Sequence, residues 1–346
     1  MVGMHDAPLI SPENKDSDRD TFAGLPKVTL HEHVPSDAAT PADLTAATAA
    51  AVAALAADNV VYAELRLHAE IYPFSAQEAV DAALAGLDHA GLDARLVIMG
   101  LRGSTTLQEL AALTVAAARK DKADRGSDGS RIVGFALGGD VAQPLPDVDA
   151  LVATLRRGFL PFELHADGEI DDVAAGVQAG VNRLSHATAL VDDFTANLDG
   201  IAPGEVSGWV CDRRIPVIFS PAVEIMRGQL EDLSDHPLPL LQQLGFTCTI
   251  SAGLPEVGTL TDQFVALNET LSYGLEEFFD LTVKAVENAF APQVVREKLL
   301  ETTILPAYEE LGDPEFAEDA LFRGEDADAA SDHDHGHDHH DHGHTH

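Results

Sequence analysis

The chain has 346 residues, of which 45% are hydrophobic and 23% are charged, and this is enough apolar material for one large domain or two ordinary ones. Its 58 acidic and 21 basic residues give a formal charge of −37, which excludes nucleic acid and anionic membrane as expected partners. Two cysteines, Cys211 and Cys248, exclude a disulfide scaffold and favour a reducing compartment.

The first 24 residues are expected to form a flexible segment ahead of the fold. Residues 1–20 are polar and acidic, without the basic start and apolar core of a signal peptide. The most apolar stretch, residues 46–57, is too short to span a bilayer. These features predict a soluble cytoplasmic protein, and they leave its oligomeric state open.

From residue 26 onward, short β-rich runs alternate with helical patterns, which is typical of parallel strands joined by crossover helices. Eight strand-helix units in about 230 residues predict a closed (β/α)8 TIM barrel. Beyond them, residues 261–310 predict three helices that form a C-terminal helical extension. The predicted strands are 28–33, 60–67, 93–101, 131–140, 160–166, 182–187, 215–220 and 246–251.

Histidines stand at the ends of three predicted strands. The first strand ends with His31 and His33, the fifth with His165 and the sixth with His186. Side chains two residues apart share one face of a strand, and the functional groups of a TIM barrel gather where its strands end. Three neutral imidazoles with one open position for water form a common catalytic zinc arrangement. The sequence therefore predicts a site for one divalent metal, with Zn²⁺ as the expected ion.

The same strand ends carry a resemblance to a known family. Residues 26–33 (PKVTLHEH) resemble the Pro-Lys-x-Glu-Leu-His-x-His opening of the adenosine deaminase family, a branch of the metal-dependent amidohydrolase barrels. Further blocks follow in the family's order, and the likeness covers residues 25–311, which are expected to form one domain. These blocks are 60–66 (VVYAELR), 133–140 (VGFALGGD), 183–187 (RLSHA), 258–264 (GTLTDQF) and 287–290 (ENAF).

The resemblance implies a zinc-dependent hydrolytic deaminase of adenosine or a related purine or heterocyclic amine. In the family, a metal-bound hydroxide attacks the carbon that bears the amine, and ammonia leaves. The resemblance assigns His31, His33 and His165 as zinc ligands and His186 as the residue that orients or deprotonates the water. It also assigns the backbone NH of Gly139 to contact with the purine. A small molecule is therefore the expected partner.

The carboxylates of the family's site are missing or displaced in this chain. The family's eighth strand ends in Asp-Asp-Pro, whereas residues 250–255 read ISAGLP, and Glu256 is the nearest acid. The family's general acid is the Glu of His-Ala-Gly-Glu, whereas residues 165–169 read HADGE. Asp167 and Glu169 are both candidates for this role, with Glu169 favoured, unless they only cap the helix that follows.

The segment that covers the site in family members is also shorter in this chain. Family members commonly carry dozens of residues between the first two strands, whereas this chain has only residues 34–59 there. An uncovered site admits water, which weakens the charge interactions inside it. Two functions therefore stay open: a working adenosine deaminase-like hydrolase, and a degenerate deaminase-like barrel that binds metal or purine with little or no turnover.

The final segment, residues 312–346, is expected to be a disordered acidic tail that binds metal. Its last fourteen residues hold eight of the chain's sixteen histidines, interleaved with Asp and Gly. Histidines at such short spacing offer many partial chelate sets. We therefore expect additional weak metal binding by this tail.

Calorimetric titration with zinc tests the tail directly. The full chain should bind more zinc than a chain that ends at Asp326, and the additional ions should bind weakly, because each chelate set is incomplete. Equal stoichiometry for the two chains would exclude the tail as a metal-binding segment.

Overall fold

The computed structural model describes residues 15–126, 129–198 and 200–311. Eight strands form one sheet in the order β1-β2-β3-β4-β5-β6-β9-β10, and each neighbouring pair is parallel. The strands are β1 (Lys27–His33), β2 (Val60–Leu67), β3 (Asp93–Leu101), β4 (Ile132–Gly138), β5 (Phe162–His165), β6 (Arg183–Ser185), β9 (Val217–Phe219) and β10 (Cys248–Ile250). The predicted (β/α)8 barrel is confirmed, and each predicted strand overlaps an observed one.

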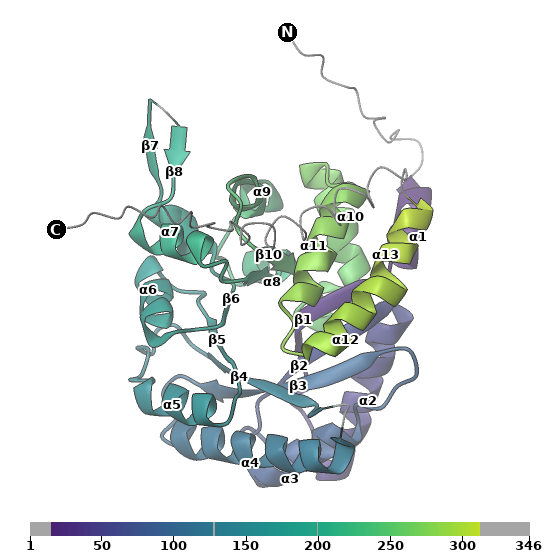
Figure 1. The fold of residues 1–346 in the computed structure, drawn as a ribbon, viewed down its shortest axis with the longest axis vertical. Helices are drawn as coiled ribbons and strands as arrows, with labels where there is room; N and C mark the ends of the chain where they lie inside the picture. Colours follow the sequence, from purple (N-terminus) through teal and green to yellow (C-terminus); the bar gives the residue numbers. More distant parts are fainter. Residues whose placement is uncertain (1–14, 127–128, 199, 312–346) are drawn as a thin grey trace, which may run out of the picture.

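Helices surround the sheet, and several lie between consecutive strands in the chain (Figure 1). They are α1 (Lys15–Gly24), α2 (Pro41–Ala57), α3 (Ala76–Ala85), α4 (Leu107–Arg125), α5 (Asp149–Arg157), α6 (Ile170–Ala179), α7 (Glu205–Asp212), α8 (Pro221–Met226), α9 (Leu238–Gln243), α10 (Leu260–Leu271), α11 (Leu275–Glu287), α12 (Gln293–Leu299) and α13 (Leu305–Leu311). A π-helical turn, Leu300–Ile304, joins α12 to α13. The expected helical extension is thus formed by α10, α11 and the run from α12 to α13.

Helix α2 is the crossover between β1 and β2, and its start follows from its sequence. Thr40 and Asp43 form a capping box, in which each side chain accepts a hydrogen bond from the other residue's backbone NH. Pro41 fills the first helical position, where no NH is needed. Residues 34–59 are all described and contain no other helix or strand, so no additional helices cover the barrel mouth from this segment.

The N-terminal part of the fold begins earlier than the expected boundary. Helix α1 lies within the 24 residues expected to be flexible, and it packs against α10. The buried ring of Phe22 meets Phe278 edge to face, with ring centroids 5.0 Å apart. This aromatic contact ties α1 to the helical extension. Residues 1–14 and the predicted tail, residues 312–346, lie outside the described residues.

A two-stranded hairpin was not predicted from the sequence. Strands β7 (Thr195–Asn197) and β8 (Gly200–Ala202) pair antiparallel and project from the barrel beside α7 (Figure 1). Each has three residues, and all three of β8 are exposed, so the buried-strand pattern that marks the barrel strands is missing there.

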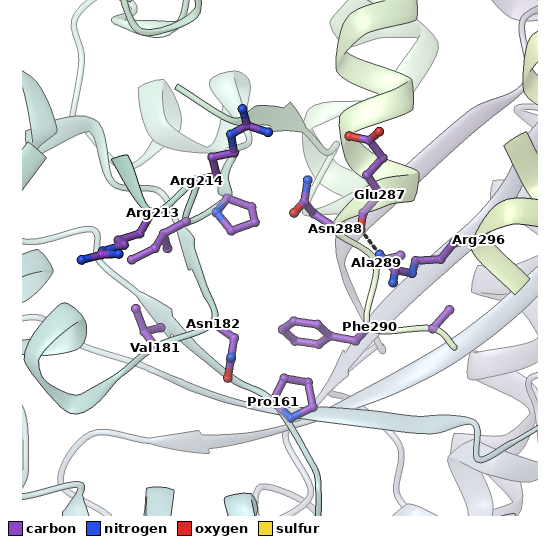
Figure 2. Close-up of a pocket in the computed structure, with 13 residues that line it drawn as sticks. Pro161, Val181, Asn182, Arg213, Arg214, Glu287, Asn288, Ala289, Phe290 and Arg296 are labelled. Carbon is purple, nitrogen blue, oxygen red and sulfur yellow. Dashed lines mark hydrogen bonds between the residues drawn. The ribbon is translucent and has the colours of Figure 1, made fainter. Parts of the chain in front are cut away.

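A pocket of about 420 Å³ lies at the opposite end of the barrel from the strand ends that carry the histidines. Pro161, Asn182 and Pro216 line it from the segments that enter β5, β6 and β9. Figure 2 shows the side chains of Arg213 and Arg214 pointing away from one another, so they do not converge on a common ligand position. This end of the barrel is thus separate from the predicted site.

The barrel has one seam, between β10 and β1. These strands stand at the two ends of the strand order, and no backbone ladder between them is present in the described part of the chain. Side chains connect them instead. Leu30 N donates to Ser251 Oγ at 3.2 Å, and the backbone NH groups of Ala252 and Gly253 donate to Glu32 Oε1 at 3.2 and 3.3 Å.

Replacing Ser251 with Ala tests the seam. The change leaves the buried Leu30 NH without its acceptor, so the free energy of unfolding in urea should fall by about 1–3 kcal/mol. Thr249→Val is the matched control on β10, because the Thr249 hydroxyl is buried and has no hydrogen-bond partner among the described residues. Equal unfolding free energies for the two variants would contradict a structural role for the Ser251 hydroxyl.

Candidate metal centre

Four histidines meet at the ends of the barrel strands. His31 and His33 come from β1, His165 ends β5 and His186 directly follows β6. One ring nitrogen each of His31, His165 and His186 lies within 4.8 Å of the others, and all three residues are buried. The ring centroid of His31 is 4.5 Å from that of His165 and 4.8 Å from that of His186. The structure thus brings histidines from β1 and from the neighbouring strands β5 and β6 close together.

His33 stands beside this group rather than within it. Its Nε2 atom is 3.2 Å from Nε2 of His31, whereas its ring centroid is 6.4 Å from that of His165. Two nitrogens bound to one tetrahedral zinc ion, each at about 2.0–2.1 Å, lie roughly 3.3 Å apart. The spacing of His31 and His33 is therefore that of two ligands of one ion. Which three of the four histidines bind the metal stays a prediction.

The ring nitrogens fit a divalent cation. His165 Nε2 and His186 Nε2 are buried, and neither has a hydrogen-bond partner in the described ranges. Burial lowers the pKa values of His31, His33 and His165 well below the ordinary 6.5, so these rings are neutral near pH 7. Neutral imidazole is the form that binds a metal, and a bound cation would supply the missing partners.

The backbone at His186 is strained. Its φ angle is +58°, a left-handed conformation that is uncommon for residues other than glycine. The residue is held there because its backbone NH donates to Ile218 O at 2.9 Å. Strain of this kind concentrates at functional sites, where the surrounding structure enforces it.

A hydrogen-bonded chain behind His186 fixes its tautomer. Leu238 N donates to His236 Nδ1 at 3.0 Å, so the proton of His236 is on Nε2, which donates to Glu224 Oε2 at 2.7 Å. Burial raises the pKa of Glu224, but the hydrogen bonds from His186 and His236 outweigh it and lower that pKa to about 2. The ionised Oε1 of Glu224 is 2.9 Å from His186 Nδ1, which must therefore donate. This leaves Nε2 of His186 as the ring nitrogen without a partner among the described residues.

Sequence reasoning missed the roles of Glu224 and His236. Glu224 is in the first turn of α8, and its Oε1 also accepts from Ser220 N at 2.9 Å. His236 lies in the segment before α9. The sequence contains no local pattern that connects either residue to His186, because the contact depends on how α8 packs against the barrel mouth.

Glycine at position 138 positions His165. A Cβ atom added at Gly138 would lie 2.7 Å from His165 Nδ1 and 2.2 Å from the Met99 side chain, so only glycine fits there. Gly139, the residue predicted to contact the purine, follows with a φ of +111° and is partly exposed. Gly138 is thus required by close packing, whereas Gly139 is favoured because its φ is positive.

The candidate acids lie in different environments. Asp167 Oδ2 forms an ion pair with Arg227 Nη1 at 3.1 Å, while its Oδ1 is buried and has no hydrogen-bond partner among the residues described. Glu169 is exposed at the N-cap of α6 and makes no capping hydrogen bond with its side chain. Glu256 is exposed in the short 3-10 turn Pro255–Val257.

Comparison with known proteins identifies the family of the chain. The family model described as adenosine deaminase matches residues 17–305. The chain belongs to the adenosine deaminase family. An adenosine deaminase of Mycobacteroides abscessus is 31% identical over 273 residues, which are 73% of each chain.

Two solved structures share the fold of this adenosine deaminase family member. An adenine deaminase from Arthrobacter aurescens superposes with a TM-score of 0.67 at 17% identity and covers 83% of this chain and 99% of its own. An amidohydrolase from Burkholderia ambifaria, with bound zinc, has a TM-score of 0.68 at 16% identity and covers 92% and 97%.

Family membership confirms the resemblance inferred from the sequence and the expectation of a hydrolase that acts on C–N bonds. The family, together with the histidine group, implies a divalent metal. In the described part of the chain, every helix is too short or too polar to cross a membrane.

Acid should destabilise the metal-free protein from pH about 6.5 downward. Burial lowers the pKa values of His31, His33 and His165 in the folded state, whereas the unfolded chain takes up protons at the ordinary value of 6.5. The stability that these neutral rings contribute is complete above that pH, and it is lost as the pH falls toward their lowered folded-state pKa values.

Urea unfolding with a chelator present, from about pH 8 to about pH 5, measures this dependence. His165→Gln should show a shallower loss of unfolding free energy, because one buried titrating ring is removed. His89→Gln is the control, since His89 is exposed on the surface. The same pH dependence for His165→Gln and the unsubstituted chain would contradict the argument.

Proposed function

We propose that this adenosine deaminase family member is a zinc-dependent hydrolytic deaminase, which releases ammonia from adenosine or a related purine or heterocyclic amine. The observation that carries the proposal is the state of His186. Glu224 holds its Nδ1, so Nε2 is the nitrogen that it can offer to the group formed with His31 and His165. The names of the curated relative and of the Arthrobacter structure, an adenosine deaminase and an adenine deaminase, support purine amines as the substrate class.

His31, His33 and His165 would hold the zinc ion, as the resemblance to the family implies. Zinc in such a site acidifies water and so supplies a nucleophile near neutral pH. His186 Nε2 accepts a proton from the attacking water or orients it. The positive charge that develops on His186 is stabilised by the ionised Glu224, which His236 and Ser220 N fix in place.

The proton donor to the heterocycle is proposed on the segment after His165. Asp167 is better placed than Glu169, because its buried Oδ1 has no partner in the described structure, whereas Glu169 is exposed to solvent. The ion pair with Arg227 orients the carboxyl group through Oδ2, so the proton that is passed to a ring nitrogen would have to be carried on Oδ1. Gly139 directly follows the end of β4, and its backbone NH is proposed to contact the purine.

Ammonia release from the zinc-loaded full chain tests the function, with adenosine, adenine and related amines as substrates. His186→Ala should lower the rate by about 10²- to 10⁴-fold, because the general base is removed. His89→Ala, at an exposed position, should leave the rate unchanged. Zinc bound without ammonia release from any of these amines would exclude a deaminase and leave a barrel that binds metal or purine without turnover.

A further inference from the structure

We propose that Glu163 is a positioning residue of the metal centre: it accepts a hydrogen bond from Nδ1 of His31, so that Nε2 of His31 is the metal-binding nitrogen. The inference rests on the zinc site of the proposed function and deepens it. It names a carboxylate of this chain that sequence reasoning did not assign to the site.

The carboxylate of Glu163 lies close to His31 and His165 in the barrel interior. Glu163 precedes His165 by two residues on β5, so both side chains point to the barrel interior. Glu163 Oε1 is 3.4 Å from His31 Nδ1 and 3.7 Å from His165 Nε2, and all three side chains are buried. His31 Nδ1 makes no hydrogen bond to any other described residue. A shift of a few tenths of an ångström would complete a hydrogen bond to Oε1.

Surrounding groups hold Glu163 in this position. Arg66 Nη2 contacts both of its oxygens, Arg183 Nε donates to Oε2 at 2.7 Å, and Ser185 Oγ donates to Oε1 at 3.2 Å. A carboxylate between two guanidinium groups is ionised and only accepts hydrogen bonds. His31 can donate a hydrogen bond to this carboxylate only if its Nδ1 is protonated. In the neutral ring, the lone pair is then on Nε2.

The other ring nitrogen of His31 already faces a second predicted ligand. His31 Nε2 is 3.2 Å from His33 Nε2, the spacing of two nitrogens on one ion. A carboxylate behind a metal-binding histidine commonly fixes its tautomer and ring orientation. Direct ligation by Glu163 fits less well, because Oε1 is already engaged by Arg66 and Ser185.

Zinc affinity, measured by chelator competition in the full chain, separates positioning from general stability. Glu163→Gln should weaken zinc binding by about 10- to 100-fold, because the amide no longer fixes the tautomer of His31. Glu64→Gln is the matched control: it breaks the same buried network, yet Glu64 contacts Arg183, Tyr62 and the backbone of Phe290 rather than a histidine. It should bind zinc as tightly as the unsubstituted chain. The tail histidines are the same in all three chains.

Nitrogen NMR of the histidine rings in the unsubstituted, zinc-loaded chain gives a second readout, in which Glu163 itself is not substituted. His31 should show a protonated Nδ1 and a metal-bound Nε2, with its signals assigned by their loss in His31→Gln. The opposite tautomer would overturn the inference, and so would equal zinc affinities for Glu163→Gln and Glu64→Gln. In either case, ammonia release would still stand as evidence for the proposed function. An unsubstituted chain that binds no zinc would overturn both.

Discussion

The interior of the barrel is organised by four buried charges that pair with one another. Glu64 and Arg66 from β2, Glu163 from β5 and Arg183 from β6 are all fully buried, and each carboxylate contacts a guanidinium group. Breaking a buried pair by removing one partner costs about 3–5 kcal/mol, because the remaining charge has no compensation. A single neutral substitution at any of these four positions would therefore leave an uncompensated charge in the barrel interior. Since Glu163 also reaches His31, the same network forms the floor of the metal centre.

Two histidines of the site have a carboxylate behind them, and the two carboxylates come from different parts of the fold. Glu163 approaches His31 from the barrel interior, and Glu224 approaches His186 from α8 at the mouth. In both cases the ring nitrogen next to the carboxylate is Nδ1, which leaves Nε2 as the nitrogen available to a ligand. This arrangement is pre-organised, because the tautomers are set before a ligand arrives. It gives a physical reason why the histidine group can keep a function although the family's Asp-Asp pair is missing.

The sequence predicted the elements whose pattern is local. The eight barrel strands, the capping box of α2 and the histidines at the strand ends all follow from residue spacing and from the polarity of neighbouring positions. The contacts that complete the site are long-range and have no such pattern. Glu224 is 38 positions from His186, and the seam between β10 and β1 joins residues 221 positions apart. Helix α1 was missed for a similar reason, because its order comes from packing on the far end of the chain.

The seam lies next to the histidine group. β1 carries Leu30, which is bonded across the seam to Ser251, and directly after it His31. A fluctuation that separates β1 from β10 would thus move His31 away from His165 and His186. Metal binding by these rings and the contact between β1 and β10 are therefore thermodynamically linked. An ion that binds only when the seam is closed stabilises the closed seam. A bound metal ion would therefore reduce local opening between β1 and β10, which is expected to be more frequent in the metal-free protein.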